Sequence, residues 1–266
     1  MTGSYMLKGG VSLVSSFLKE TLNYMFPGCC AICGRLADAS DRFSQYEDFC
    51  VKLYGHPSGL HICGKCLSSL APYESDSRWF LCLSNPYNDD PFPGLALYMP
   101  LAYEGVTKRA MPMIKFGKRR EIAGLFGALL GTFMKNDSIC ADLIVPVPLS
   151  EARMKERGFN QAYEMAVPAA AILGIPYAGD VLYRERNTSR QTELKGNIAR
   201  IANVSGAFKV SEEWDLTGLT VIVMDDVVTT GFTLHEAATA LYEAGAGKVL
   251  CTAFAGNRQV KNAEPY

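Results

Sequence analysis

Two adjacent carboxylates, Asp225 and Asp226, stand between an apolar run and a turn that contains threonines and a glycine. The apolar run covers residues 221–224, and the turn covers residues 229–233. Backbone N–H groups at the start of a helix bind phosphate dianions, and threonine hydroxyls add further donors. Gly231 would let the backbone approach such a ligand closely. This order of residues predicts a phosphate site that follows a buried strand and opens a helix.

The acidic pair favours a second, uncharged or cationic group beside that phosphate. Two carboxylates would repel a phosphate, but they suit ribose hydroxyls, or they could help to hold a hydrated metal ion. A Walker loop, G-x-x-x-x-G-K-[ST], does not occur in the chain. The alternative interpretation is an ordinary strand, acidic turn and helix that binds no ligand.

Two C-x2-C pairs form a second group with chemical potential, Cys30 with Cys33 and Cys63 with Cys66. Two intervening residues let one tight turn direct both sulfurs at one ion, and four thiolates complete a tetrahedral zinc site. The gap between the pairs holds 29 residues, which a polar loop could accommodate. We therefore expect one structural zinc ion. The alternatives are free buried thiols or a redox motif, and three residues could replace a ligand: Cys29, Cys50 and His61.

The composition limits the class of protein. With 266 residues, 48% of them hydrophobic, and a formal charge of −1, the chain is neither disordered nor globally basic. No apolar run approaches the roughly 18–20 residues of a membrane span. An odd number of cysteines without an export signal indicates a reducing compartment, so we expect a cytoplasmic protein without disulfides. We expect small apolar core residues at Cys82, Cys140 and Cys251.

Positive charge gathers in three segments of this nearly neutral chain. Arginine presents a planar fork to phosphate oxygens and therefore suits a pyrophosphate group. Solvated surface charge is the alternative for each residue, but for Arg153 and Arg157, beside the V-P-V-P turn at 145–148, we favour ligand binding. The three groups are Lys115, Lys118, Arg119 and Arg120; Arg153, Lys155 and Arg157; and Arg184, Arg186, Arg190, Lys195 and Arg200.

Alternating strand and helix patterns follow residue 95 and predict a doubly wound α/β fold, a parallel sheet covered on both faces. Ligands of such sheets bind beyond the carboxyl ends of the strands. Pro168 is expected to kink its helix or end it early. The expected strands cover 95–103, 143–147, 181–183, 219–224 and 248–255, and the expected helices 122–133, 158–173 and 233–244.

The residues before 95 divide into two further parts. Apolar residues at helical spacing predict a helix over residues 1–26, which Pro27 and Gly28 end. The cysteine pairs follow, and then a proline-rich linker. We expect an N-terminal helix over 1–28, a zinc-binding module with linker over 29–94, and the α/β domain over 95–266.

The segment 221–233 resembles the 5-phosphoribosyl-1-pyrophosphate (PRPP) motif of type I phosphoribosyltransferases. This resemblance implies a phosphoribosyltransferase-like sheet, PRPP as ligand and Mg²⁺ bound with it. It also implies that Asp225 and Asp226 are the catalytic-site carboxylates that hold the ribose hydroxyls. The implied PRPP-binding set is Asp225, Asp226, Val227, Val228, Thr229, Thr230, Gly231, Phe232 and Thr233, with the 5′-phosphate on Thr229, Thr230, Gly231 and Thr233.

Three more segments make the chain similar to the ComF family (ComFC/GntX-like proteins), which is linked to natural transformation and DNA utilisation. They are V-P-V-P at 145–148 with R-G-F-N-Q at 157–161, the stretch from Arg186 to Phe208, and Tyr103–Gly105 with Ile114–Phe116. The resemblance implies a pyrophosphate loop over 148–158. It also implies single-stranded DNA or other DNA-uptake proteins as partners. The candidate pyrophosphate or DNA contacts are Lys115, Arg153, Arg157, Gln191 and Arg200.

Two functions follow from these expectations. In the first, the protein transfers a pentosyl group from PRPP to an acceptor and releases pyrophosphate. In the second, it is a non-catalytic factor that binds single-stranded DNA with its basic loops. Phe159, Tyr163 and Tyr183 could then stack on bases, although each is more typical of a core.

Overall fold

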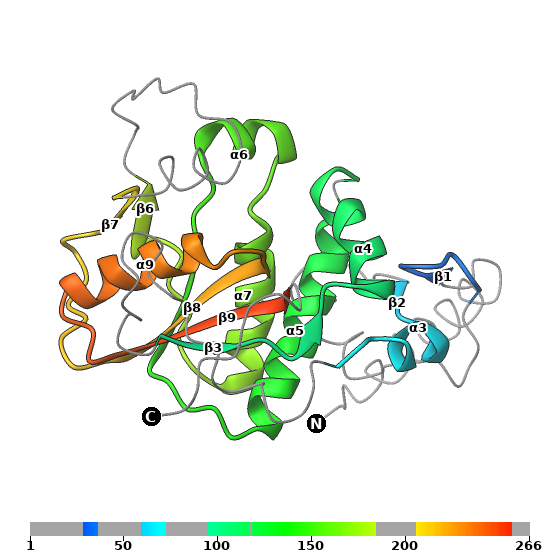
Figure 1. Cartoon of the computed structure of the whole chain (residues 1–266), viewed down its shortest axis with the longest axis horizontal. Coiled ribbons are helices and arrows are strands. Elements are labelled where there is room, and N and C mark those ends of the chain that lie inside the picture. Colours follow the sequence, from blue (N-terminus) through cyan, green and yellow to red (C-terminus); the bar gives the residue numbers. More distant parts are fainter. Residues whose placement is uncertain (1–28, 37–59, 73–94, 118, 185–205, 257–266) are drawn as a thin grey trace, which may run out of the picture. The chain divides into compact units, whose positions relative to one another are not determined.

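The computed structural model describes residues 29–36, 60–72, 95–117, 119–184 and 206–256 (Figure 1). It forms two compact units, residues 1–67 and 68–266. The predicted N-terminal helix and most of the linker lie outside the described residues, so the three-part division stays a prediction. In the first unit, β1 (Cys29–Cys30) pairs in parallel with β2 (Leu60–His61), and α3 (Gly64–Ser68) begins there.

A parallel sheet forms the centre of the second unit, as predicted. Its strand order is β3 (Ala96–Tyr98), β9 (Lys248–Gly256), β8 (Thr220–Val228) and β5 (Leu143–Pro146). The short β4 (Leu101–Ala102) also pairs with β9. The apolar run at 221–224 is fully buried, as expected for a strand that is covered on both faces.

Helices cover both faces of this sheet. On one face, Val221 and Val223 of β8 share a core cluster with Leu234 of α9 (Phe232–Glu243). On the other, Phe126 of α5 (Arg120–Asn136) stacks on Phe254 of β9 at 4.1 Å. Strand side chains alternate between faces, so α9 and α5 lie on opposite sides of the sheet (Figure 1).

Two glycines let α5 pack closely on α7 (Gln161–Leu173). A Cβ on Gly127 would collide with the carbonyl oxygen of Met165, and one on Gly131 would lie 2.8 Å from the Cα of Ala169. Of the two outcomes expected at Pro168, a kink or an early end of the helix, the early end is wrong, because α7 continues through this residue to Leu173. An interior proline removes one helical hydrogen bond and crowds the carbonyl group four residues earlier, and packing along α5 stabilises the rest of the helix.

Several elements differ from the sequence-based expectation. The helix expected over 158–173 is α7, which starts at Gln161, and a helix that was not predicted, α6 (Glu151–Arg157), ends before it at Gly158, which has a left-handed φ of 79°. The helix α4 (Gly105–Lys115) was not predicted. The strand expected near 181–183 is β6 (Leu182–Arg184), which pairs antiparallel with β7 (Phe208–Val210) outside the central sheet.

The path of the chain around β5 creates a switch in direction. After β5, the chain passes through α7 and returns at Tyr177, which forms a parallel bridge to Ile144 of β5. The next central strand, β8, pairs with β5 at Ile144↔Ile222. The segment that follows β5 therefore lies on one side of this strand, at the edge of the sheet, whereas the next central strand, β8, lies on its other side. In doubly wound sheets, ligands bind at the carboxyl ends of two strands related in this way.

Among the residues that the structure describes, no helix is long and apolar enough to cross a membrane. The cysteines outside the two pairs differ from one another. Cys251 is buried in the core as predicted, but Cys140 is exposed, so its prediction as a core residue is wrong. It follows α5 in the connection that leads to β5, where the chain reaches the surface. Cys82 lies outside the described residues.

Candidate functional site

The acidic pair belongs to strand β8, which extends further than predicted. β8 remains paired with β9 beyond the apolar run, at Asp225↔Ala253 and up to Val228. Its other neighbour, β5, ends at Pro146, opposite Met224. The backbone beyond that point has no β5 partner, and the aspartates supply acceptors. The N–H of Asp226 donates to Oδ1 of Asp225 at 2.7 Å, and that of Val227 donates to Oδ1 of Asp226 at 2.7 Å.

A lysine from a distant helix neutralises one of these carboxylates. The Nζ atom of Lys115, in the last turn of α4, lies 2.9 Å from Oδ2 of Asp226. The Asp226 residue is only 6% exposed. An uncompensated carboxylate at this depth would cost several kcal/mol, on the order of what buried charges cost elsewhere. The structure thus brings Lys115 to the acidic pair, next to the phosphate motif.

Asp225 titrates unlike an exposed aspartate. Burial, and after it the negative charge of Asp226, raises the pKa of Asp225 to about 7, although the charges of Lys115 and Arg153 act in the opposite direction. A carboxyl group with such a pKa can donate or accept a hydrogen bond near neutrality. It can therefore bind a hydroxyl group in either role.

Helix α9 starts directly after the acidic strand with an unusual cap. Gly231 occupies the N-cap position with a left-handed φ of 81°, and no side chain caps the helix. Serine, threonine, aspartate and asparagine are preferred here because their side chains accept from the first N–H groups, whereas glycine supplies no such acceptor. Thr229 and Thr230, just before it, are exposed. Uncapped N–H groups and exposed hydroxyls at one helix start are the donors that a phosphate requires.

The basic residues after β5 have two different roles. The guanidinium of Arg153 on α6 is exposed, and its charge acts on both Asp225 and Arg184. Arg157 instead donates from Nη1 to Oε1 of the buried Gln161 at 2.7 Å. The structure therefore brings Arg153 into the electrostatic field of the acidic pair and holds Arg157 within the loop. Gln191 and Arg200 lie outside the described residues.

The R-G-F-N-Q segment forms a corner that the sequence interpretation did not anticipate. Asn160 is the N-cap of α7 and accepts from the N–H of Ala162 at 3.0 Å. Its Nδ2 donates to the carbonyl oxygen of Val147 at 2.9 Å, directly after β5. This asparagine joins both ends of the loop that carries α6. An N-cap residue before an apolar helical run was the signal in the sequence that could have revealed it.

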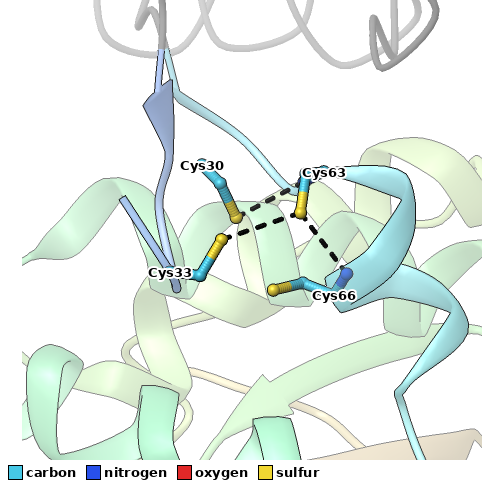
Figure 2. Close-up of side chains that lie close together, drawn as sticks. All are labelled: Cys30, Cys33, Cys63 and Cys66. Carbon is cyan, nitrogen blue, oxygen red and sulfur yellow. Dashed lines mark hydrogen bonds between the residues drawn. The ribbon is translucent and has the colours of Figure 1, made fainter. Parts of the chain in front are cut away.

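The four paired cysteines gather in the first unit (Figure 2). Their sulfurs all lie within 4.8 Å of one another, and Sγ of Cys33 is 3.8 Å from Sγ of Cys63. Four sulfurs about 2.3 Å from one zinc ion are about 3.8 Å apart in tetrahedral geometry. Gly34, with a left-handed φ of 72°, permits the first turn. The cluster could therefore hold a metal ion.

The environment of the cluster favours a thiolate at one position. Burial alone would raise the pKa of Cys63, but hydrogen bonds, first from the backbone N–H of Cys66 and then from Arg35, lower it to about 6. Burial raises the pKa of Cys66. Of the three alternative ligands, Cys29 is exposed and outside the cluster. Cys50 and the side chain of His61 are not among the described parts.

Comparisons with known proteins agree with this architecture. Residues 160–265 match the model of the phosphoribosyl transferase domain. The DNA utilization protein YhgH of Salmonella typhi is 32% identical over 227 residues, which cover 84% of this chain and 87% of that protein. Competence protein ComFC of Bacillus subtilis is 32% identical over 144 residues, 54% of this chain and 56% of the relative.

Among solved structures, the Bacillus subtilis glutamine PRPP amidotransferase has a TM-score of 0.35 and 23% identity, covering 49% of this chain and 25% of that one. A likeness at this score supports no conclusion.

Proposed function

This chain belongs to the ComF family of phosphoribosyltransferase-like proteins, and from this we propose that it binds PRPP at the carboxyl end of β8. The observation that carries the proposal is the continuous order of the acidic pair, the exposed threonines and the uncapped start of α9. These features follow one another at the switch between β5 and β8. The 5′-phosphate would bind at residues 229–233, and the ribose hydroxyls at Asp225 and Asp226.

The pyrophosphate group of PRPP would lie on the side of α6. Arg153 is exposed there, and its charge acts on Asp225. Mg²⁺ would accompany PRPP and neutralise the pyrophosphate. The protein would then catalyse pentosyl transfer to an acceptor by positioning the ribose and stabilising the departing pyrophosphate, without a covalent nucleophile. Lys115 would hold Asp226 in place.

The metal in the cysteine cluster is proposed to be a structural zinc ion. Four cysteine ligands close the coordination sphere and leave no site for a substrate. The 3.8 Å spacing of Cys33 and Cys63 supports this assignment. Zinc would therefore stabilise the first unit and take no part in transfer.

A second candidate function is the binding of single-stranded DNA near the same site, as a cytoplasmic protein of DNA uptake or utilisation. The relatives carry the names DNA utilization protein and competence protein. The exposed Arg153 and Lys155 on α6 support phosphate contacts, and Tyr183, 48% exposed, supports base stacking. Phe159 is buried and belongs to the core, and Tyr163 packs edge-on against Tyr177.

Isothermal calorimetry with PRPP and Mg²⁺ tests the first function. The double variant Asp225→Ala, Asp226→Ala should lose at least about tenfold in affinity, because charged hydrogen bonds contribute about 1.5–3 kcal/mol each. The double variant Glu212→Ala, Glu213→Ala removes two adjacent exposed acids and serves as the control. Equal affinity in all three proteins would refute the assignment. Pyrophosphate release in an acceptor screen tests catalysis, and anisotropy of a labelled oligonucleotide across a salt series tests the DNA function.

A further inference from the structure

The acidic pair at the end of β8 has a cation beside it before any ligand arrives. The Nζ atom of Lys115 lies 2.9 Å from Oδ2 of Asp226, and the two side chains are only 22% and 9% exposed. Ion pairs on the surface are weakened by water and salt, but partly buried pairs are screened much less. The ammonium of Lys115 is therefore a lasting feature of this site and not a transient surface contact.

The end of α4 holds Lys115 in this position. Its neighbour Ile114 and, one turn earlier, Met111 are buried. The N–H of Phe116 donates to the carbonyl oxygen of Pro112 at 2.8 Å and so closes the last turn. A lysine on a packed helix end has less backbone freedom to lose, when it pairs with a distant carboxylate, than a lysine on a free loop. The packing of α4 thus brings the ammonium to the end of the strand.

The oxygens of the acidic pair already accept hydrogen bonds. Oδ1 of Asp225 accepts from the N–H of Asp226, and Oδ1 of Asp226 accepts from the N–H of Val227, both at 2.7 Å. A divalent cation such as Mg²⁺ binds carboxylate oxygens directly, at about 2.0–2.1 Å, and demands near-octahedral geometry. If it bound Oδ2 of Asp226, it would lie within about 5 Å of the ammonium, which would repel it. The pair therefore does not fit a metal ion while Lys115 is in place.

The charge of the site also favours a neutral ligand. The ammonium of Lys115 offsets the carboxylate of Asp226, so that only Asp225 would supply net negative charge. Burial, and after it the charge of Asp226, raises the pKa of Asp225 to about 7, so this carboxyl group is partly protonated near neutrality. Metal affinity depends on the charge of the ligands, whereas a hydroxyl group needs only an oxygen that accepts its hydrogen bond.

We propose that Lys115 determines the ligand specificity of the acidic pair: it occupies the place of a divalent cation beside Asp226 and reserves the pair for neutral hydroxyl groups. This inference deepens the proposed function and rests on it for the identity of the hydroxyl ligand, the ribose of PRPP. The Mg²⁺ that accompanies PRPP would then be bound by the pyrophosphate and not by the acidic pair. The exclusion of metal ions by Lys115 can be measured without PRPP.

The test is a titration of the full-length protein with Mn²⁺ alone, in which electron paramagnetic resonance measures the free ion. Mn²⁺ prefers the same oxygen ligands as Mg²⁺. Wild type and Asp226→Asn should bind Mn²⁺ with equal, weak affinity, because Asp226 offers no metal site while Lys115 is present. Lys115→Met should bind Mn²⁺ more tightly than wild type by about tenfold or more, since Oδ2 of Asp226 then becomes available. Lys115→Gln, which is also uncharged, should show the same gain.

Three control variants locate the effect. Lys115→Arg keeps the positive charge and should bind Mn²⁺ no better than wild type. The double variant Lys115→Met, Asp226→Asn should lose the gain, which would assign the bound ion to Asp226. Lys135→Met is the matched control, because it removes an exposed lysine at the end of α5, and it should behave like wild type.

Two results would overturn the inference: tighter Mn²⁺ binding by wild type than by Asp226→Asn, or the absence of a gain in both neutral variants of Lys115. The first comparison leaves Lys115 in place and does not depend on how well its variants fold. PRPP calorimetry on wild type separates the two proposals. A wild type that excludes Mn²⁺ but binds no PRPP contradicts the proposed function alone, whereas one that binds PRPP and also holds Mn²⁺ at Asp226 contradicts this inference alone.

Discussion

The Nζ atom of Lys115 lies 2.9 Å from Oδ2 of Asp226 and so joins the end of α4 to the carboxyl end of β8. The two residues are far apart in the sequence. The contact allows two adjacent acids to occupy the end of a buried strand, because one of them is neutralised. It also places the end of α4 beside the proposed ribose site.

Replacement of Lys115 with methionine should destabilise the protein, because it leaves the carboxylate of Asp226 buried without its cation. We expect a loss of about 1–3 kcal/mol in the free energy of unfolding, less than for a fully buried pair since the lysine is partly exposed. Urea denaturation measures this. Lys115→Arg keeps the charge and should lose less than half as much, and equal losses for both variants would show that the charge is unimportant.

The raised pKa of Asp225 predicts a specific dependence of stability on pH. Its value rises from 3.8 to about 7, so its contribution is fully present below about pH 4 and is lost as the pH rises through 7. Asp225→Asn has no carboxyl group to ionise and should not show this loss. Between pH 4 and pH 8, the free energy of unfolding of the variant should therefore rise relative to that of wild type by an amount on the order of 1–3 kcal/mol. Parallel stability curves for the two proteins would contradict the raised pKa.

Substitution of Arg153 should affect ligand binding, whereas substitution of Arg157 should affect stability. Arg153→Ala removes an exposed cation whose charge acts on Asp225, so PRPP affinity should fall about tenfold while the melting temperature remains unchanged. Arg157→Ala leaves the buried Gln161 without its donor and should cost about 1–3 kcal/mol of stability. Calorimetry and thermal melts of both variants test this, and the reverse pattern would exchange the two roles.

The cysteine cluster should contain about one zinc ion per chain in protein purified without chelator. Cys63→Ser removes a ligand and should abolish stoichiometric zinc, unfolding the first unit while the second unit keeps its own core. Elemental analysis and circular dichroism measure both effects. Cys140→Ser changes an exposed cysteine outside the cluster and should retain the metal. Wild-type protein that contains no metal would contradict the proposed structural role of zinc.

Gly127→Ala should destabilise the second unit although alanine is the better helix former. The added Cβ would collide with the carbonyl oxygen of Met165, and overpacking of this kind costs about 1–3 kcal/mol. Lys135→Ala, at an exposed position of the same helix, should change the free energy of unfolding by less than about 0.5 kcal/mol. A stabilised Gly127→Ala would mean that α5 and α7 can move apart.

Local patterns in the sequence were sufficient for the main elements. The apolar runs at 143–147, 219–224 and 248–255 became β5, β8 and β9 in one parallel sheet. The apolar face from Ile122 to Phe133 became α5. Hydrophobic periodicity is a local property, so it is readable without knowledge of partners. The same holds for the two C-x2-C pairs, whose spacing already predicts that four sulfurs meet.

The errors came where a distant partner decides the outcome. Pro168 does not end α7, because the contact with α5 stabilises the residues beyond it. Strand β8 does not end at residue 224 but continues through the acidic pair to Val228, because β9 continues to pair with it. Helix α7 begins at Gln161 and not at 158, because Asn160 caps it and donates to the carbonyl oxygen of Val147 across the loop. None of these partners is a sequence neighbour of the residue that it affects.

The sequence alone determined the chemistry that is available: four thiols in two pairs, an acidic pair before a threonine- and glycine-containing turn, and arginines that suit phosphates. Only the tertiary structure decided which charges meet. It paired Lys115 with Asp226, left Arg153 exposed with its charge acting on Asp225, and bonded Arg157 to Gln161. The physical reason is that ion pairing and burial depend on distances in space, which are set by the packing of whole helices on the sheet and not by spacing along the chain.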